Sequence, residues 1–328
     1  MRVAVLGVTG LVGREMLSVL EKRQFPVAEL VPLASEKSAG RKILFKGREW
    51  EVRAVSEDAF DGVQIALFSA GSDASRRWAP VAASRGAVVV DNSSAWRMER
   101  DVPLVVPEVN AEDIQGHRGI IANPNCATIQ ALVALNPLHR EATLESFSAV
   151  TFQSVSGTGS AALEELREGS AAFLSGNFFE PRVYPRRIAF NAIPQIGAFD
   201  EEGISEEEWK MVNESRKILH LPGLSVSCTT VRVPVFRGHS EAIVAAFRAP
   251  LSPERARQVL AKAPGIVLED DPGKGIYPTA LAAAETDAVH VGRIRRDTGR
   301  PGALAFWVVA DNLRKGAALN AVQIAEAL

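Results

Sequence analysis

"RVAVLGVTGLVG", residues 2–13, places Gly7, Gly10 and Gly13 directly after a short apolar run and at the start of an amphipathic segment. Apolar residues recur near helical period over residues 11–22, so the stretch predicts a strand followed by a helix. Glycines at this junction permit a tight turn and leave the helix N-terminus open to the pyrophosphate of a dinucleotide. The GxxGxxG spacing differs from the commoner GxGxxG, and a sharp turn without a ligand is the alternative explanation.

Further apolar runs follow in the first third of the chain, and helical patterns separate several of them: AELVPLAS (28–35), VQIALFSAG (63–71), AVVVDNSS (87–94) and GIIANPNC (119–126). This alternation predicts a parallel sheet with crossover helices. After residue 140 the apolar runs are longer, and helices are expected near residues 158–173, 205–219 and 252–262. The expected fold class is therefore α/β, with a parallel-sheet domain followed by a mixed or antiparallel α+β domain and a closing helix.

The bulk properties of the chain limit its partners. A length of 328 residues suggests about two domains. The net charge of −2 gives no basic field for nucleic acid, and no polybasic or long apolar run indicates a membrane. No Cys or His pair has zinc-ligand spacing, so no metal is expected. We expect a small-molecule enzyme of the cytoplasm.

The segment after the second apolar run bears on the choice of cofactor. Ser35, Lys37, Ser38 and Arg41 offer donors suited to a 2′-phosphate, which favours NADP. Glu36 is the candidate that would instead bind a free ribose 2′-hydroxyl, as in NAD-specific sites. A solvated polar loop is the alternative explanation for Glu36 and Arg41.

The chain has two cysteines, Cys126 and Cys228. Cys228 lies in a run of alternating β-branched residues, which predicts a sheet position with nothing to activate the thiol. Cys126 follows Asn125, a capping residue type, and precedes apolar residues at helical spacing. At a helix N-terminus the pKa of a thiol can fall from about 8.5 to between about 3.5 and 7.5. A thiolate beside a nicotinamide indicates acyl chemistry through a thioester.

Seven ordered motifs resemble those of the aspartate-β-semialdehyde dehydrogenase family over nearly the whole chain. They are GVTGLVG (7–13), DNSSAWR (91–97), NPNC (123–126), TFQSVSGTG (151–159), EEWKM (207–211), RVPVFRGH (232–239) and DNLRKGAALN (311–320). The resemblance implies a Rossmann-type NADP-binding domain at residues 1–126, to which a C-terminal helix at 310–328 returns. It implies a catalytic and dimerisation domain at 127–309.

The resemblance also implies the reaction and its residues. The reaction is the reversible NADP(H)-dependent interconversion of L-aspartate 4-semialdehyde plus inorganic phosphate with L-4-aspartyl phosphate, in the biosynthesis of lysine, threonine and methionine. Cys126 would be the nucleophile, His239 the general acid/base and Gln153 the residue that orients the acyl intermediate. Substrate binding is assigned to Arg232 for the α-carboxylate, Glu207 for the ammonium, and Arg97 and Lys210 for phosphate.

Residues implied to contact the cofactor are Gly7, Thr9, Gly10, Leu11, Val12, Gly13, Ser35, Lys37, Ser38, Ser69, Ala70, Gly71, Ser156, Gly157 and Asn312. Taken without the resemblance, His239 would be a surface histidine, and Glu207 and Lys210 an exposed helical ion pair. Departures from the family pattern are Val8 and Lys37, where Ala and Arg are frequent. The second leaves open how strongly NADP is preferred over NAD.

Two other functions remain open at this point. N-acetyl-γ-glutamyl phosphate reductases use related chemistry, but their substrate has no free ammonium for Glu207 to bind. A catalytically inactive dinucleotide-binding homologue would not need Cys126, Gln153 and His239 together. The expected assembly is a homodimer, with a homotetramer as the alternative.

Overall fold

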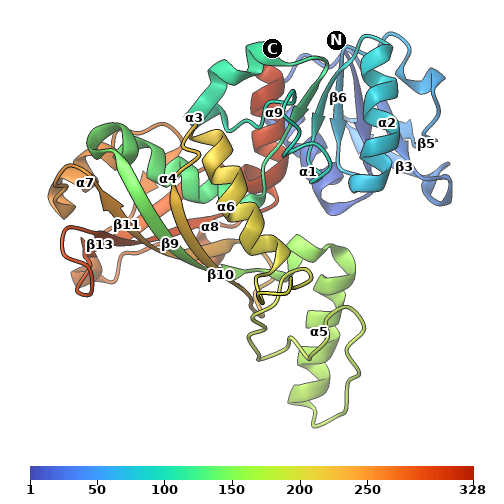
Figure 1. The fold of residues 1–328 in the computed structure, drawn as a ribbon. Helices are drawn as coiled ribbons and strands as arrows, with labels where there is room; N and C mark the ends of the chain where they lie inside the picture. The colour runs from blue at the N-terminus through green and yellow to red at the C-terminus, as the bar shows by residue number, and fades with distance from the viewer. The chain divides into compact units, whose positions relative to one another are not determined.

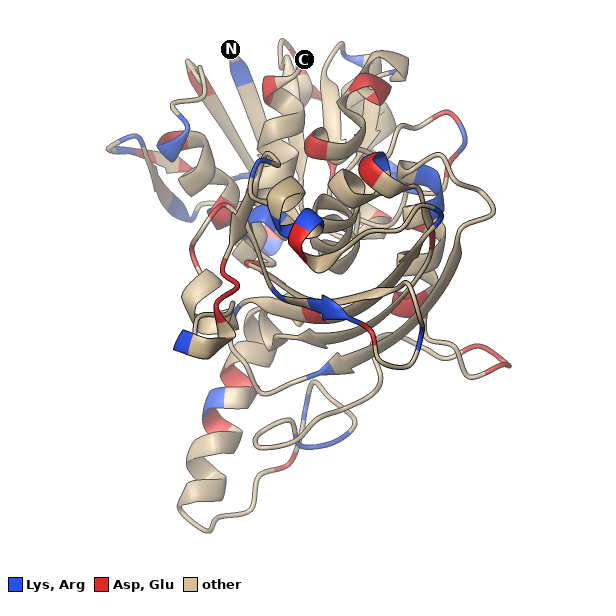
Figure 2. Ribbon diagram, turned by 90° about the vertical axis from the view of Figure 1, so that its left-hand side faces the viewer, with Lys and Arg blue, Asp and Glu red and all other residues tan.

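The computed structural model describes residues 1–328, which form two compact units (Figure 1). The first unit contains residues 1–125 and 316–328, and the second contains residues 126–315. The chain therefore leaves the first unit once and returns to it at the C-terminus. Basic and acidic residues are interspersed along the elements of each unit (Figure 2). No helix combines the length and apolar character needed to cross a bilayer.

The first unit is built on a six-stranded parallel sheet with the strand order β5-β2-β1-β6-β7-β8. Its strands are β1 (Arg2–Leu6), β2 (Glu29–Ala34), β5 (Arg53–Ala54), β6 (Ile65–Phe68), β7 (Val88–Asp91) and β8 (Ile120–Ala122), and a separate hairpin is formed by β3 (Lys42–Phe45) and β4 (Arg48–Glu51). The chain passes from β1 outward to β2 and β5, and then to β6 on the other side of β1. This reversal creates a switch point beyond the carboxyl ends of β1 and β6, where open α/β sheets bind ligands.

Helices cover both faces of this sheet: α1 (Leu11–Lys22), α2 (Ser72–Ser84), α3 (Pro107–Asn110) and α9 (Leu319–Glu326), with short 3-10 turns η1 (Glu36–Ser38), η2 (Asp58–Phe60) and η3 (Ala111–Gly116). Val3 and Val5 of β1 belong to a buried cluster that includes residues of α1 and α9. Ala4 and Leu6 belong to a second cluster that includes residues of α2. Because side chains alternate along a strand, α1 and α9 lie on one face and α2 on the other (Figure 1). The predicted helix over residues 11–22 is confirmed.

The second unit contains a six-stranded mixed sheet with the order β10-β9-β11-β14-β13-β12. Its strands are β9 (Leu144–Gln153), β10 (Ser225–Arg232), β11 (His239–Phe247), β12 (Ile266–Leu268), β13 (Val289–Arg296) and β14 (Leu304–Ala310). The two outermost pairs are parallel and the three inner pairs are antiparallel. The expected mixed α+β architecture is confirmed.

The helices of this unit are α4 (Cys126–Ala142), α5 (Ser160–Leu174), α6 (Glu206–Ile218), α7 (Pro253–Leu260) and α8 (Ala280–Ala283), with 3-10 turns η4 (Val155–Thr158) and η5 (Pro272–Lys274), and a π turn η6 (Arg314–Ala318) follows β14 at the boundary of the unit. α4 packs on β9, β11 and β14, and α6 packs on β10. α6 begins with a capping box, in which Ser205 and Glu208 satisfy each other's backbone N–H groups. α5 extends away from the sheet (Figure 1).

The two faces of the second sheet differ in character. On the outer face, Ala242 of β11 pairs in register with Val150 of β9 and Trp307 of β14. On the inner face, Glu241 pairs with Thr151 and Val308. The inner face is buried, whereas Val150 remains 39% exposed on the outer face. The inner face therefore carries the functional side chains described below, whereas part of the outer face around Val150 is accessible.

Candidate active site

The glycine-rich turn of the first unit is closely packed. A Cβ atom on Gly7, whose φ is +85°, would lie 2.3 Å from the backbone oxygen of Ser69 after β6. A Cβ on Gly13 would lie 2.2 Å from the oxygen of Gly7. Both positions therefore require glycine for the turn after β1, the loop after β6 and α1 to approach one another. Thr9, Leu11 and Val12 complete the turn around Gly10.

The start of α1 suits an anionic ligand. Gly10 is the N-cap residue, it is exposed, and no side chain caps the first turn. The first turn also lacks acidic residues, which would repel an anion. Free N–H groups at this switch point fit the pyrophosphate of a dinucleotide. Ser69, Ala70 and Gly71 follow β6 on the other side of the same switch point.

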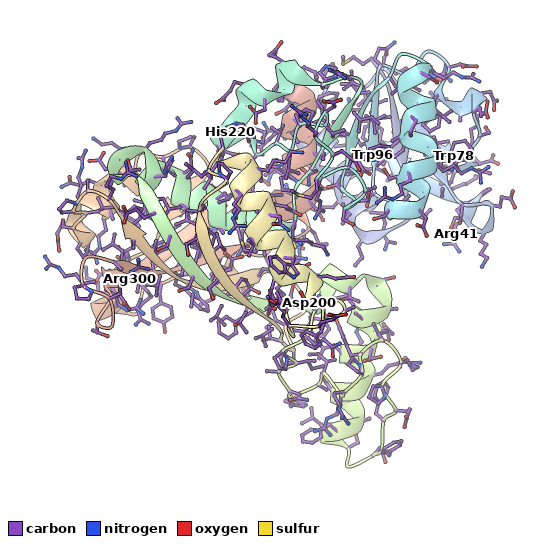
Figure 3. All side chains as sticks on the ribbon, viewed as in Figure 1. Arg41, Trp78, Trp96, Asp200, His220 and Arg300 are labelled. Atoms are coloured by element: carbon purple, nitrogen blue, oxygen red, sulfur yellow. The ribbon has the colours of Figure 1, made fainter.

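The loop predicted to meet the ribose follows β2. The backbone N–H of Gly7 donates to the oxygen of Leu33 at 2.9 Å, so the end of β2 lies beside the glycine-rich turn. Ser35 and Lys37 are exposed in the short turn that follows, and Ser38 is half-buried. Arg41 extends outward from this unit into solvent (Figure 3).

Arg97 is held at the end of the segment after β7. Its Nε donates to the oxygen of Asn123 at 3.0 Å, and its Nη2 donates to the oxygen of Asn92 at 2.8 Å. Both of these hydrogen bonds therefore hold the guanidinium against backbone carbonyl groups. A guanidinium held in this way is suited to binding a phosphate.

In the second unit, Cys126 is the first residue of α4 and is half-buried. The partial positive charge at a helix N-terminus favours a thiolate over a thiol. Cys228 differs: it lies on β10, and burial raises the pKa of its thiol well above the usual range, with further contributions from Glu241, Glu208 and Glu207. The prediction that Cys228 is the unreactive thiol is consistent with this environment.

His239 begins β11 and is fully buried, which differs from the surface-histidine alternative. The backbone N–H of Ser154 donates to its Nδ1 at 3.0 Å. Because a backbone N–H can only donate, Nδ1 must accept, and the proton of the neutral imidazole is on Nε2. Burial, followed by the positive charge of Arg232, lowers the pKa of His239 to about 3. The neutral ring therefore predominates at physiological pH.

Arg232 and His239 converge at Gly157. A Cβ on Gly157 would lie 3.0 Å from Nη1 of Arg232 and 3.4 Å from Nε2 of His239. Neither Nε of Arg232 nor Nε2 of His239 has a hydrogen-bond partner, although both atoms are buried. Buried donors of this kind are normally satisfied, so their pairing with a ligand would explain them. The absence of a side chain at Gly157 leaves room for that ligand.

Glu207 links the remaining polar residues. Nε2 of Gln153 donates to Oε1 of Glu207 at 3.3 Å, and Nζ of Lys210 donates to its Oε2 at 3.1 Å. Glu207 is only 6% exposed, so the pair with Lys210 differs from the exposed helical ion pair that was the alternative. Gln153 is also the register partner of Arg232. The structure therefore brings together Gln153, Glu207, Lys210, Arg232 and His239.

Asn312, which the resemblance assigns to the cofactor, is buried and makes several hydrogen bonds within the second unit. Its Oδ1 accepts from Ser154 Oγ, Ser156 Oγ and the Gly238 backbone N–H at 3.0 to 3.1 Å. Its Nδ2 donates to Ser156 Oγ at 2.9 Å. Asn312 is thus a buried residue that connects the loop before Gly157 with Gly238, which precedes His239.

Sequence reasoning missed Ser154, whose N–H and hydroxyl both contact His239. The residue lies inside the motif TFQSVSGTG, but a serine in such a loop carries no distinguishing signal. Its role depends on a hydrogen bond between segments 85 residues apart. Only the strand register brings the two together.

A parallel sheet with a glycine-rich turn at its switch point, in one chain with a cysteine, an arginine and a buried histidine, defines a nucleotide-dependent oxidoreductase of the Rossmann class. Residues 2–117 match the family described as semialdehyde dehydrogenase, NAD binding domain. Residues 135–315 match semialdehyde dehydrogenase, dimerisation domain. The chain belongs to the aspartate-semialdehyde dehydrogenase family.

Full-length relatives support this assignment. The aspartate-semialdehyde dehydrogenase of Aquifex aeolicus (strain VF5) is 52% identical over 331 residues, which cover 100% of this chain and 97% of the relative. The crystal structure of aspartate semialdehyde dehydrogenase II from Vibrio cholerae complexed with ASA has a TM-score of 0.97 and 48% identity, covering 100% of this chain and 97% of that one. The structure of the Candida albicans enzyme with NADP has a TM-score of 0.76 and 25% identity, covering 100% and 98%.

Proposed function

We propose that the chain interconverts L-aspartate 4-semialdehyde plus inorganic phosphate with L-4-aspartyl phosphate, with NADP(H) as cofactor and a thioester on Cys126. The observation that carries this proposal is the convergence of Arg232 and His239 at Gly157, with unpaired buried nitrogens on both side chains. A guanidinium suits the α-carboxylate of the substrate, and the Nε2–H of His239 suits an oxygen that becomes negative. The similarity to an enzyme solved with ASA supports the same substrate.

The other substrate groups match the remaining residues. The carboxylate of Glu207 is the partner for the α-ammonium, and Gln153, already hydrogen-bonded to Glu207, orients the acyl group. Lys210 and Arg97 provide two positive charges for the phosphate dianion. When an ammonium binds Glu207, Lys210 has a second anionic partner available in the phosphate. Each charged group of the substrate thus receives a residue of opposite charge.

In the biosynthetic direction, the Cys126 thiolate attacks the acyl carbon, and the carbonyl oxygen becomes an oxyanion that accepts a hydrogen bond from Nε2 of His239. The C–O bond to phosphate breaks, and phosphate leaves with a proton taken from water. After reduction, the thiohemiacetal oxyanion expels the thiolate and yields the aldehyde. In this proposal His239 keeps its proton on Nε2 throughout, so it acts as a hydrogen-bond donor in place of the general acid/base that the resemblance implies.

The first unit is proposed to hold NADP(H), and a bound reduced nicotinamide would supply the hydride that reduces the thioester. Residues of the turn around Gly10 and the loop at Ser69–Gly71 are assigned to the nucleotide. Ser156 and Gly157 are assigned to the nicotinamide end. Ser35, Lys37 and Ser38 offer donors for a 2′-phosphate. A relative solved with NADP supports this choice over NAD.

The assembly is proposed to be a homodimer that covers the outer face of the second sheet. Val150, Ala242 and Trp307 form an apolar row across three strands of that face. Beside it lies a cavity of about 400 Å³ lined by residues including Tyr277, Pro278 and Trp307. A reducing compartment such as the cytoplasm would keep Cys126 available as a thiol.

The test is a phosphate-dependent assay of NADP reduction by the purified chain. L-aspartate 4-semialdehyde should be oxidised, and N-acetylglutamate 5-semialdehyde should not, because its acylated nitrogen cannot pair with Glu207. Preference for the acetylated aldehyde would identify an N-acetyl-γ-glutamyl phosphate reductase. Loss of NADP reduction with both aldehydes, together with intact nucleotide binding, would identify an inactive homologue.

A further inference from the structure

Asn320 on α9 is a fully buried polar side chain that the proposed mechanism does not use. α9 (red in Figure 1) returns to the first unit and packs on β7, so Asn320 belongs to the same unit as Arg97. Nδ2 of Asn320 donates to the backbone oxygen of Val105 at 2.9 Å and to Oδ1 of Asn123 at 2.7 Å. Because a backbone carbonyl can only accept, the contact with Val105 establishes that the NH₂ end of this amide faces Asn123.

Asn123 is also buried, and it connects Asn320 with Asn92, the residue that follows β7. Since Oδ1 of Asn123 accepts from Asn320, its Nδ2 is the donor, and this atom donates to Oδ1 of Asn92 at 2.9 Å. The amide of Asn92 is oriented in turn, because its Nδ2 donates to the backbone oxygen of Phe68 at 3.0 Å. The three amides therefore form one chain of hydrogen bonds from α9 to the end of β7, with a donor facing an acceptor at each step.

The backbone carbonyls of Asn123 and Asn92 are the two groups that hold Arg97. The oxygen of Asn123 accepts from Nε of Arg97 at 3.0 Å, and the oxygen of Asn92 accepts from its Nη2 at 2.8 Å. The two asparagines are thus joined twice, through their side chains and through the guanidinium that their carbonyls share. Movement of either side chain would displace the carbonyl of the same residue and tilt the guanidinium. The orientation of Arg97 therefore depends on the amide chain that begins at Asn320.

We propose that Asn320 is a positioning residue for Arg97, because it holds in place the two asparagines whose carbonyls orient the guanidinium. This inference rests on the phosphate-binding role proposed above for Arg97. The N–H groups of a guanidinium donate in fixed directions, so phosphate is bound well only while the plane of Arg97 keeps its orientation. The C-terminal helix thereby contributes to phosphate binding without contacting phosphate itself.

Hydrogen exchange at the Nε–H of Arg97 tests the positioning without any assay of activity. In nitrogen-15 NMR spectra of the labelled chain, this signal is identified by its loss in Arg97→Lys. We expect Asn320→Leu to raise the exchange rate of this hydrogen about tenfold, because the carbonyl of Asn123 would be held less firmly. Equal rates in the wild-type chain and Asn320→Leu would overturn the proposal.

Gln323→Leu is the matched control on the same helix. Nε2 of Gln323 donates to Oε1 of Glu108 at 3.0 Å, so this substitution also removes an amide of α9 that contacts the rest of the first unit. It should leave the exchange rate at Arg97 within about twofold of wild type, because its contact leads elsewhere. An equal acceleration in Gln323→Leu and Asn320→Leu would indicate general loosening of α9 and would contradict a specific role for Asn320.

Phosphate kinetics test the functional consequence. Asn320→Leu should raise KM for phosphate about tenfold and change KM for L-aspartate 4-semialdehyde by less than about twofold. Arg97→Ala should raise KM for phosphate at least as much, and combining it with Asn320→Leu should add little, because both changes act on one contact. An effect of Arg97→Ala without one of Asn320→Leu would overturn the positioning role alone. No effect of Arg97→Ala on KM for phosphate would overturn the proposed role of Arg97 as well.

Asn92→Ala covers the case in which Asn320→Leu does not fold. Asn92 is only partly buried, and the substitution removes the side chain that accepts from Asn123 but keeps the carbonyl that accepts from Arg97. It should raise both the exchange rate at Arg97 and KM for phosphate about three- to tenfold. Wild-type values of both quantities in Asn92→Ala would overturn the link between the amide chain and the guanidinium.

Discussion

The backbone N–H of Ser154 donates a hydrogen bond to Nδ1 of His239 at 3.0 Å. This contact sets the tautomer of a buried imidazole and directs its remaining N–H toward Gly157 and Arg232. In the proposed reaction, His239 would therefore offer a hydrogen bond to the developing oxyanion without changing its charge. Protonation of Nδ1 would place two donors against each other.

The first prediction concerns the charge of His239. Because burial and Arg232 lower its pKa from 6.5 to about 3, the ring should stay neutral from pH 5 to pH 8. Nitrogen-15 NMR of the labelled chain should therefore show one histidine that does not titrate over this range and disappears in His239→Asn. A titration of that signal near neutrality would contradict the assignment.

The lowered pKa of His239 also makes the stability of the folded chain depend on pH. The unfolded chain binds a proton at His239 near pH 6.5 and the folded chain does not, so the contribution of this residue to stability falls as pH decreases from about 6.5 toward 3. The stability of His239→Asn relative to wild type should thus increase over that interval, measured by denaturant unfolding. Curves that remain parallel from pH 7 to pH 4 would argue against the depressed pKa.

Substitution of His239 should separate hydrogen bonding from proton transfer. His239→Ala removes the donor to the oxyanion and should lower kcat by about 10²- to 10³-fold. His239→Asn and His239→Gln retain an N–H donor without a titratable group, and the better-placed of the two should recover part of the loss. Equal activity of all three variants would indicate that the proton itself must be transferred.

The cysteines should differ in reactivity. One equivalent of iodoacetamide per chain should react at neutral pH, at Cys126, and Cys228 should remain unmodified because its pKa is raised by burial. Cys228→Ser should therefore leave the alkylation stoichiometry unchanged, whereas Cys126→Ser should abolish it and reduce kcat by at least about 10³-fold. Modification of Cys228 at a similar rate would invalidate the distinction.

The loop after β2 should determine cofactor preference. Lys37→Ala should raise KM for NADP about tenfold and leave KM for NAD nearly unchanged, because only NADP carries the 2′-phosphate. Lys42→Ala is the matched control, since Lys42 is exposed and pairs with Glu49 at 2.9 Å. A rise in KM for both cofactors would place Lys37 at a group common to NADP and NAD.

The first sheet was accessible to sequence reasoning because apolar runs alternate with helical periodicity and because Gly7, Gly10 and Gly13 mark the crossover. The order of the second sheet was not, since β9 pairs with β10 and β11 from distant parts of the chain. Residue types at a predicted helix start also identified Cys126 as a candidate, whereas Arg232 was implied by the family resemblance. By contrast, Ser154 could be assigned its contact with His239 only from the structure, which places a loop serine against the imidazole.

The most direct measurement of the central claim is the mass of the chain during turnover without phosphate. Mixing L-aspartate 4-semialdehyde with NADP should release one reduced cofactor per chain in a burst and leave one aspartyl group on the peptide that contains Cys126. Added phosphate should remove this group, and Cys126→Ala should never acquire it. Continuous turnover with no adduct, or an adduct on another residue, would contradict the account.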